Sequence, residues 1–180
     1  MDDKIEIFAN PGQDGRVHHK LAVDLYNYTW TLLDKQERSE EEIDAMIHAA
    51  HSSRYHWGQA PAHTAKQLNI GEWQLSRVYS VLNRPESALW HAQRCAAAAV
   101  DTDLQPILIA FVHEALARAN AAAGNTDEFK NHYRIALSIA DSIDDQEDRA
   151  DAAKRKVELP IELEQNQRNG NRAHRCGQNS

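Results

Sequence analysis

The sequence contains only two cysteines among its 180 residues, Cys95 and Cys176. Cys95 lies in an apolar helical pattern and Cys176 in a polar tail, so their positions do not predict a structural disulfide. Intracellular proteins commonly keep such thiols reduced, and we therefore expect a cytoplasmic protein.

Long apolar runs are also missing. The longest ones cover residues 95–100 and 106–112, far short of the roughly 20 residues that a transmembrane helix needs. The acidic start MDDKIEIFANPG lacks the positive charge of a signal peptide. We expect neither a membrane span nor a secretory leader.

Positive charge is in the minority. Lysine and arginine number 20 against 27 acidic residues, which gives a net charge of −7. Binding to nucleic acid or to an anionic membrane surface requires a basic face, so both partners are disfavoured. The short basic stretch at 168–175 does not change this balance.

Glycine and proline are few, and they stand between segments with helical periodicity. Apolar residues recur at spacings of three and four, which predicts an all-α protein. No alternation of strands and helices is visible, so a dinucleotide-binding or P-loop fold is excluded. The predicted helices cover about 18–34, 39–57, 62–82, 85–100, 104–123 and 126–143, and a last one begins near 144.

Two local signals refine these helices. Ser39 and Glu42 have the spacing of a capping box at a helix start. Asn69 is a candidate N-cap inside 62–82, so this stretch is either one helix or two. We expect residues 1–17 to form an irregular arm, 18–159 a helical domain and 160–180 a disordered polar tail.

A weak internal repeat covers the middle of the chain. Residues 75–99 align with 116–140 at an offset of 41, which superposes Arg77 on Arg118 and His91 on His132. The repeated unit is a helical hairpin. A single hairpin cannot bury its apolar faces alone, and we therefore expect the hairpins to stack.

This pattern resembles the tetratricopeptide repeat over about 70–140. The second copy has the large, small and turn residues of that repeat at Leu116, Ala117, Gly124, Asn125, Tyr133, Ala136 and Leu137, and the first copy at Leu75, Ser76, Tyr79, Ala88, Ala92 and Cys95. Phe129 stands where the repeat has a small residue, and the spacing exceeds the usual 34 residues. The segment 51–94 also looks like a bacterial protein group of no assigned function.

The resemblance implies a right-handed solenoid of stacked antiparallel helix hairpins, closed by a C-terminal capping helix. It also implies a groove lined by the first helix of each pair, with exposed groove positions at Trp73, Arg77, Glu114 and Arg118. The two arginines would hold a carboxylate or an acidic peptide, as in the carboxylate clamp of some members. Alternatively, Arg118 pairs locally with Glu114 at i−4.

A second candidate site is rich in histidine. It comprises His48, His51, Tyr55, His56 and His63. On a helix, several of these side chains point away from the apolar face, which would suit a small-molecule or enzymatic pocket. Alternatively, they bond at helix seams or face the solvent. No metal-ligand motif such as HExxH or CxxC is present, so we expect no metal and no cofactor.

The sequence therefore favours a non-catalytic interaction module that binds a protein or peptide, an acidic one among the candidates. Self-association into a homodimer is an alternative use of the same faces. The competing hypothesis is a small-molecule-binding protein or an enzyme that uses the histidine-rich site.

Overall fold

The computed structural model describes residues 11–61, 63–100 and 102–143, and within these ranges it contains six helices and no strand. They are α1 (Pro11–Leu33), α2 (Glu40–Gln59), α3 (Ala65–Val81), α4 (Pro85–Ala97), α5 (Pro106–Ala122) and α6 (Thr126–Asp141). The all-α class is confirmed for this part of the chain. The helix predicted from 144, Cys176, the tail 160–180 and residues 1–10 lie outside the described residues. None of the described helices has the length and apolarity needed to cross a bilayer.

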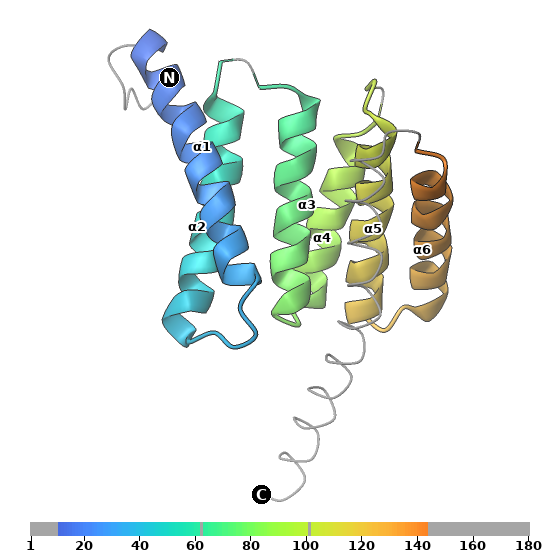
Figure 1. Ribbon diagram of the computed structural model, residues 1–180. Helices are drawn as coiled ribbons and strands as arrows, with labels where there is room; N and C mark the ends of the chain where they lie inside the picture. Colours follow the sequence, from blue (N-terminus) through green and yellow to red (C-terminus); the bar gives the residue numbers. More distant parts are fainter. Residues whose placement is uncertain (1–10, 62, 101, 144–180) are drawn as a thin grey trace, which may run out of the picture.

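The helices pack in the order of the chain, as Figure 1 shows. The closest contacts join α1 to α2, α3 to α4 and α5 to α6. The middle helix α3 also packs against α2 and α5, and its side chains reach α1 at Trp30. Each helical hairpin therefore lies against the next.

The apolar core is shared between successive hairpins. One buried cluster joins α1, α2 and α3 through residues such as Leu32, Met46 and Leu75. A second joins α3, α4 and α5, and it consists largely of alanines packed around Trp73. These two clusters each span two hairpins, whereas a third lies mainly between α5 and α6.

The two turns inside the aligned repeat have the same backbone geometry. Asn83 and Gly124, which are equivalent at the offset of 41, both have positive φ angles, 53° and 77°. In the first turn the amide of Arg84 donates to the carbonyl of Tyr79, and in the second that of Asn125 donates to Asn120, both at 2.9 Å. This is the Schellman arrangement of a helix end followed by a left-handed residue. The weak sequence repeat is therefore matched by a backbone repeat.

The helix starts follow local chemistry. The amide of Glu42 donates to Oγ of Ser39 at 3.3 Å, and the amide of Ser39 donates back to Oε2 of Glu42 at 3.1 Å. The predicted capping box is confirmed. Pro85 and Pro106 lie in the first turns of α4 and α5, where a missing amide hydrogen is tolerated.

Two boundaries differ from the predictions. The region 1–17 was expected to be irregular, but α1 already begins at Pro11. Proline is acceptable in a first helical turn, and Gly15 serves close packing rather than a turn, because a Cβ there would lie 2.4 Å from Cγ of Pro61. The stretch 62–82 contains one helix, α3, and Asn69 is a buried residue inside it. The side-chain amide of Asn69 (Nδ2) donates to the carbonyl of Cys95 at 2.9 Å instead of capping a helix.

Candidate functional site

The four residues expected to line an open groove are buried, and Trp73, Glu114 and Arg118 form a network between α3 and α5. Trp73 is 1% exposed, and its indole N–H donates to Oε2 of Glu114 at 2.7 Å. Arg118 forms an ion pair with the same carboxylate, one helical turn away. The guanidinium of Arg77 lies 5.3 Å from the centre of the Trp30 ring.

All four residues are at most 8% exposed. The prediction that Trp73, Arg77, Glu114 and Arg118 are exposed is therefore wrong, whereas the local Arg118–Glu114 pairing is present. Helical periodicity tells which side chains share a face, but not whether other residues cover that face. Buried in this way, the network ties α3 to α5.

The histidine-rich candidate site does not gather into one pocket. His48 is exposed, and Tyr55 is 54% exposed. His51 bonds through Nε2 to the hydroxyl of Tyr79 on α3 at 2.8 Å. His56 bonds to His18 on α1, and His63 bonds to the carbonyl of Ala60. These side chains therefore contact different parts of the molecule and do not line a common pocket.

Two histidine pairs bridge helices inside hairpins. Nδ1 of His18 lies 2.7 Å from Nδ1 of His56, joining α1 to α2. Nδ1 of His113 lies 3.0 Å from Nδ1 of His132, joining α5 to α6. Such a bond needs one protonated and one unprotonated nitrogen, so the two rings of a pair cannot both be cations.

Burial lowers the pKa of several of these rings. Desolvation is the main cause at His56 and at His113, and the partner histidine adds a smaller effect in each pair. Desolvation also lowers the pKa of His51, with a further contribution from His91. The fold thus favours the neutral forms of these three histidines.

Lowering the pH from about 7.5 to about 5.5 is therefore expected to destabilise the protein. Histidine in the unfolded chain titrates near pH 6.5. Below that pH the unfolded chain binds more protons than the folded chain, in which the pKa values of these histidines are lower. Stability is lost as the pH falls from the unfolded pKa toward the lower folded values. Each kcal/mol lost lowers the Tm by roughly 2–4 °C for a chain of this size, and thermal unfolding followed by circular dichroism measures it.

A matched pair of variants isolates the cause. His56→Asn combined with His113→Asn keeps a neutral hydrogen-bonding group at both seams and should flatten the pH dependence. His48→Asn, at an exposed position, should leave it unchanged. Equal Tm values at both pH values in the wild-type protein would contradict this explanation.

A buried carboxylate forms the second polar centre of the molecule. Glu72 on α3 is 3% exposed. Its Oε1 accepts hydrogen bonds from Nε of Arg54 on α2 and Nε of Arg94 on α4, both at 3.0 Å. Its Oε2 lies 2.8 Å from Nδ1 of His91. Three helices are therefore joined at one side chain.

These contacts keep the carboxyl group ionised. Burial alone would raise the pKa of Glu72, but the hydrogen bonds from His91 and Arg94 and the charges of Arg54 and Arg94 outweigh it, and the pKa lies below its ordinary value. Because an ionised carboxylate can only accept hydrogen bonds, Nδ1 of His91 carries the proton.

Aromatic rings extend this centre. The His91 ring stacks on Tyr79, with centroids 5.4 Å apart and planes 4° apart, and it also contacts His51 and the exposed Trp90. The repeat alignment pairs His91 with His132, and the same offset of 41 places Glu72, just before the aligned range, at His113. The contact between Glu72 and His91 is thus repeated as the contact between His113 and His132.

Sequence reasoning missed Glu72 and Arg94 as parts of a site. A usable signal was present, because Glu72 is the only acidic residue in the sequence between Asp44 and Glu86. The close packing of Gly71 was not visible in the sequence. A Cβ at this glycine would lie 2.6 Å from Cδ of Arg54.

The thiol of Cys95 is unsuited to nucleophilic chemistry. It is fully buried in the α3–α5 core, and burial, followed by the charge of Glu72, raises its pKa. His91, which lies one turn away on α4, bonds to Glu72 instead. The thiolate, which is the reactive form, is therefore suppressed at neutral pH.

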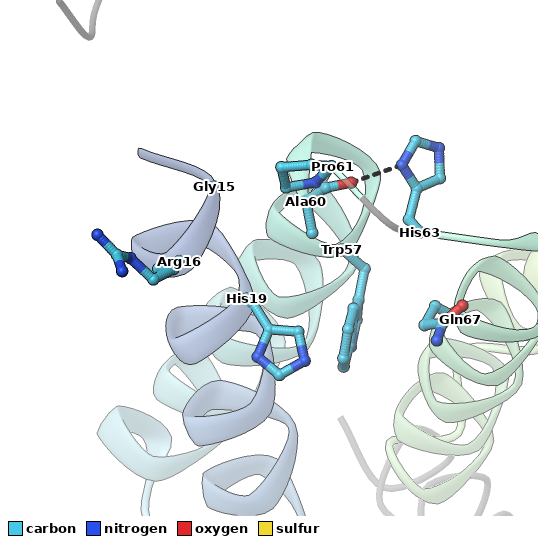
Figure 2. Close-up of a pocket in the computed structure, with 8 residues that line it drawn as sticks. All are labelled: Gly15, Arg16, His19, Trp57, Ala60, Pro61, His63 and Gln67. Atoms are coloured by element: carbon cyan, nitrogen blue, oxygen red, sulfur yellow. Dashed lines mark hydrogen bonds between the residues drawn. The ribbon is translucent and has the colours of Figure 1, made fainter. Parts of the chain in front are cut away.

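An open pocket lies where α1 and α3 begin and α2 ends. It has a volume of about 560 Å³, within the range of ligand-binding clefts. Figure 2 shows His19 of α1 and Trp57 of α2 facing each other, with Gln67 projecting from α3. The lining residues are Gly15, Arg16, His19, Trp57, Ala60, Pro61, His63 and Gln67.

The pocket combines one large apolar wall with a polar rim. The half-buried Trp57 indole packs edge-on against His19, at 5.2 Å between centroids and 85° between planes. Arg16 and His63 are exposed at the rim, and Figure 2 shows Arg16 directed away from the centre. None of the eight lining residues is acidic. Of the candidate histidines, only His63 lines this pocket.

Within the described ranges, no group of three or more histidine, cysteine or acidic side chains is arranged to hold a metal ion. In comparisons with known proteins, no family model, curated protein or solved structure matched this chain. The site must therefore be interpreted from its own geometry.

Proposed function

We propose that this chain is a tetratricopeptide-type interaction module that binds a segment of a partner protein. The serial packing of hairpins and the matching turns at Asn83 and Gly124 support the repeat assignment. Repeat proteins of this kind commonly act by binding. The pocket walled by Trp57 carries the proposal, because it is a concave site with an aromatic anchor and a polar rim.

The chemistry of the pocket specifies the partner segment. A half-buried indole and the nearby Ala60 and Pro61 suit a large apolar side chain. Arg16 supplies a positive charge at the exposed rim, and the lining has no carboxylate to repel an acid. The occupant is therefore an acidic peptide segment that carries one aromatic or large aliphatic residue between glutamates or aspartates.

The test uses a fluorescein-labelled peptide, Gly-Glu-Glu-Phe-Glu-Glu-Gly, and measures fluorescence anisotropy. The wild-type protein should bind it saturably. Trp57→Ala should bind it at least about tenfold more weakly, because burying an apolar side chain against the pocket contributes about 1.5–3 kcal/mol. Arg16→Gln should weaken binding less and should reduce its dependence on salt.

Two controls identify the site and the chemistry. Tyr28→Ala removes an exposed aromatic ring from α1, outside the pocket, and should leave peptide affinity unchanged. A peptide with lysine in place of every glutamate should not bind. Circular dichroism confirms that Trp57→Ala is folded. Absence of saturable binding to the wild-type protein, or equal affinity in Trp57→Ala, would refute the proposed function.

A further inference from the structure

We propose that Arg54 and Arg94 form a second binding site, which takes the phosphate or carboxylate group of a small ligand. The two residues come from α2 and α4 and meet over α3. Both Nε atoms lie 3.0 Å from the same Glu72 oxygen, so they are at most about 6 Å apart. This separation lets one oxyanion contact both guanidinium groups.

The local charge favours an anion. Glu72 is the carboxylate that pairs with both arginines in the described part of the chain, so two positive charges face one negative charge. The excess positive charge is local, because the whole chain carries a net charge of −7. Glu72 itself is buried and its two oxygens are already occupied by Arg54, Arg94 and His91. It therefore orients the arginines rather than filling the site.

Both guanidinium groups keep donors for a ligand. A guanidinium has five N–H donors, and each arginine donates one of them, on Nε, to Glu72. No other side-chain acceptor in the described ranges bonds to either group. The Arg94 side chain is 47% exposed and that of Arg54 is 21% exposed, so solvent reaches both.

Trp90 supplies a surface for the rest of the ligand. Its ring is 54% exposed, and the Arg94 guanidinium lies 4.6 Å from the ring centre. A guanidinium stacked on an indole is held in a fixed orientation while its edge stays available for hydrogen bonds. A ligand bound at Arg94 would thus touch the indole.

This site is distinct from the Trp57 pocket. Arg54 and Trp57 are neighbours on α2, but Arg54 is directed to Glu72 on α3, whereas Trp57 lines a pocket with residues of α1. Neither Arg54 nor Arg94 lines that pocket. The two proposals can therefore succeed or fail separately.

The experiment titrates inorganic phosphate, and in parallel acetate, into the ¹⁵N-labelled full-length protein at low ionic strength. The indole N–H signal of Trp90 is the readout. We expect saturable shifts with phosphate, and a dissociation constant about tenfold higher in Arg94→Gln because one charge-assisted contact is lost. Arg16→Gln, which changes the other pocket, should bind phosphate as the wild type does.

Several outcomes are informative. Tighter binding of phosphate than of acetate identifies phosphorylated ligands, and the reverse identifies carboxylates; both support the site. Arg54→Gln should weaken binding as Arg94→Gln does, and if it fails to fold, the half-exposed Arg94 still provides the test. The proposal is overturned if neither anion gives a saturable Trp90 shift, or if Arg94→Gln binds phosphate as tightly as the wild type.

Discussion

Replacing Glu72 by glutamine is expected to lower the free energy of unfolding by about 3 kcal/mol. Breaking a buried ion pair by removing one partner generally costs about 3–5 kcal/mol. The lower end applies here because Arg54 and Arg94 are partly exposed and can recover some hydration. Glutamine has nearly the same shape, so the loss reports charge and hydrogen bonding rather than a cavity.

The physical reason is that one carboxylate organises three helices. Without it, Arg54 and Arg94 repel each other across the α2–α4 seam, and His91 loses the acceptor for its Nδ1 proton. Glutamine keeps one acceptor oxygen, but its NH2 group would face the N–H donors of its neighbours and could not bond to them. The seam between the first and second hairpins should therefore loosen first.

Urea unfolding at neutral pH measures the effect, with Glu86→Gln as the matched control. Glu86 is exposed in the first turn of α4, and its replacement should change stability by less than about 1 kcal/mol. In the wild type the Glu72 contribution is present above about pH 4.3, the unfolded pKa, and is lost as the pH falls through the lower folded value. A change in Glu72→Gln no larger than that in Glu86→Gln would contradict this role.

Trp73→Ala is expected to destabilise the protein by about 3–5 kcal/mol, the usual cost of removing a buried tryptophan. Trp73 stacks on Phe111 of α5, with centroids 5.0 Å apart and planes at 16°, and it also packs against Trp30 of α1. Its removal leaves a cavity between α3 and α5 and deprives the buried Glu114 of a hydrogen-bond donor.

Trp90→Ala is the control for this variant. It removes the same side chain from a position that is 54% exposed, so we expect a loss below about 1 kcal/mol. Thermal and urea unfolding of both variants give the comparison. Similar stabilities of Trp73→Ala and Trp90→Ala would mean that Trp73 is not part of the core, and the interpretation of the α3–α5 network would fail with it.

The sequence predicted the helices well because their signals are local. Ser39, Pro85 and Pro106 mark helix starts through their own backbone chemistry. The start of α1 was misplaced because Gly15 lies inside the helix, where it packs closely against Pro61. This is a tertiary contact, which the local sequence does not encode.

The sites were predicted less well because they depend on what covers each helix face. The alignment superposed Arg77 on Arg118 and predicted both to be exposed, yet both are buried. It also superposed His91 on His132, but it did not predict that their partners would be Glu72 and His113. Those partners are repeat-equivalent positions on the preceding helix. Such contacts follow from how hairpins dock, which periodicity does not encode.

The most direct test of the central claim, that a partner's acidic segment occupies the Trp57 pocket, uses the four tryptophan indole N–H signals in an NMR titration with the acidic peptide. The protein has tryptophan at positions 30, 57, 73 and 90, so each signal reports a different part of the fold. We expect a saturable shift of the Trp57 signal, while the signal of the buried Trp73 stays in place. A peptide-induced shift of other indole signals with Trp57 unchanged, or no shift at all, would contradict it.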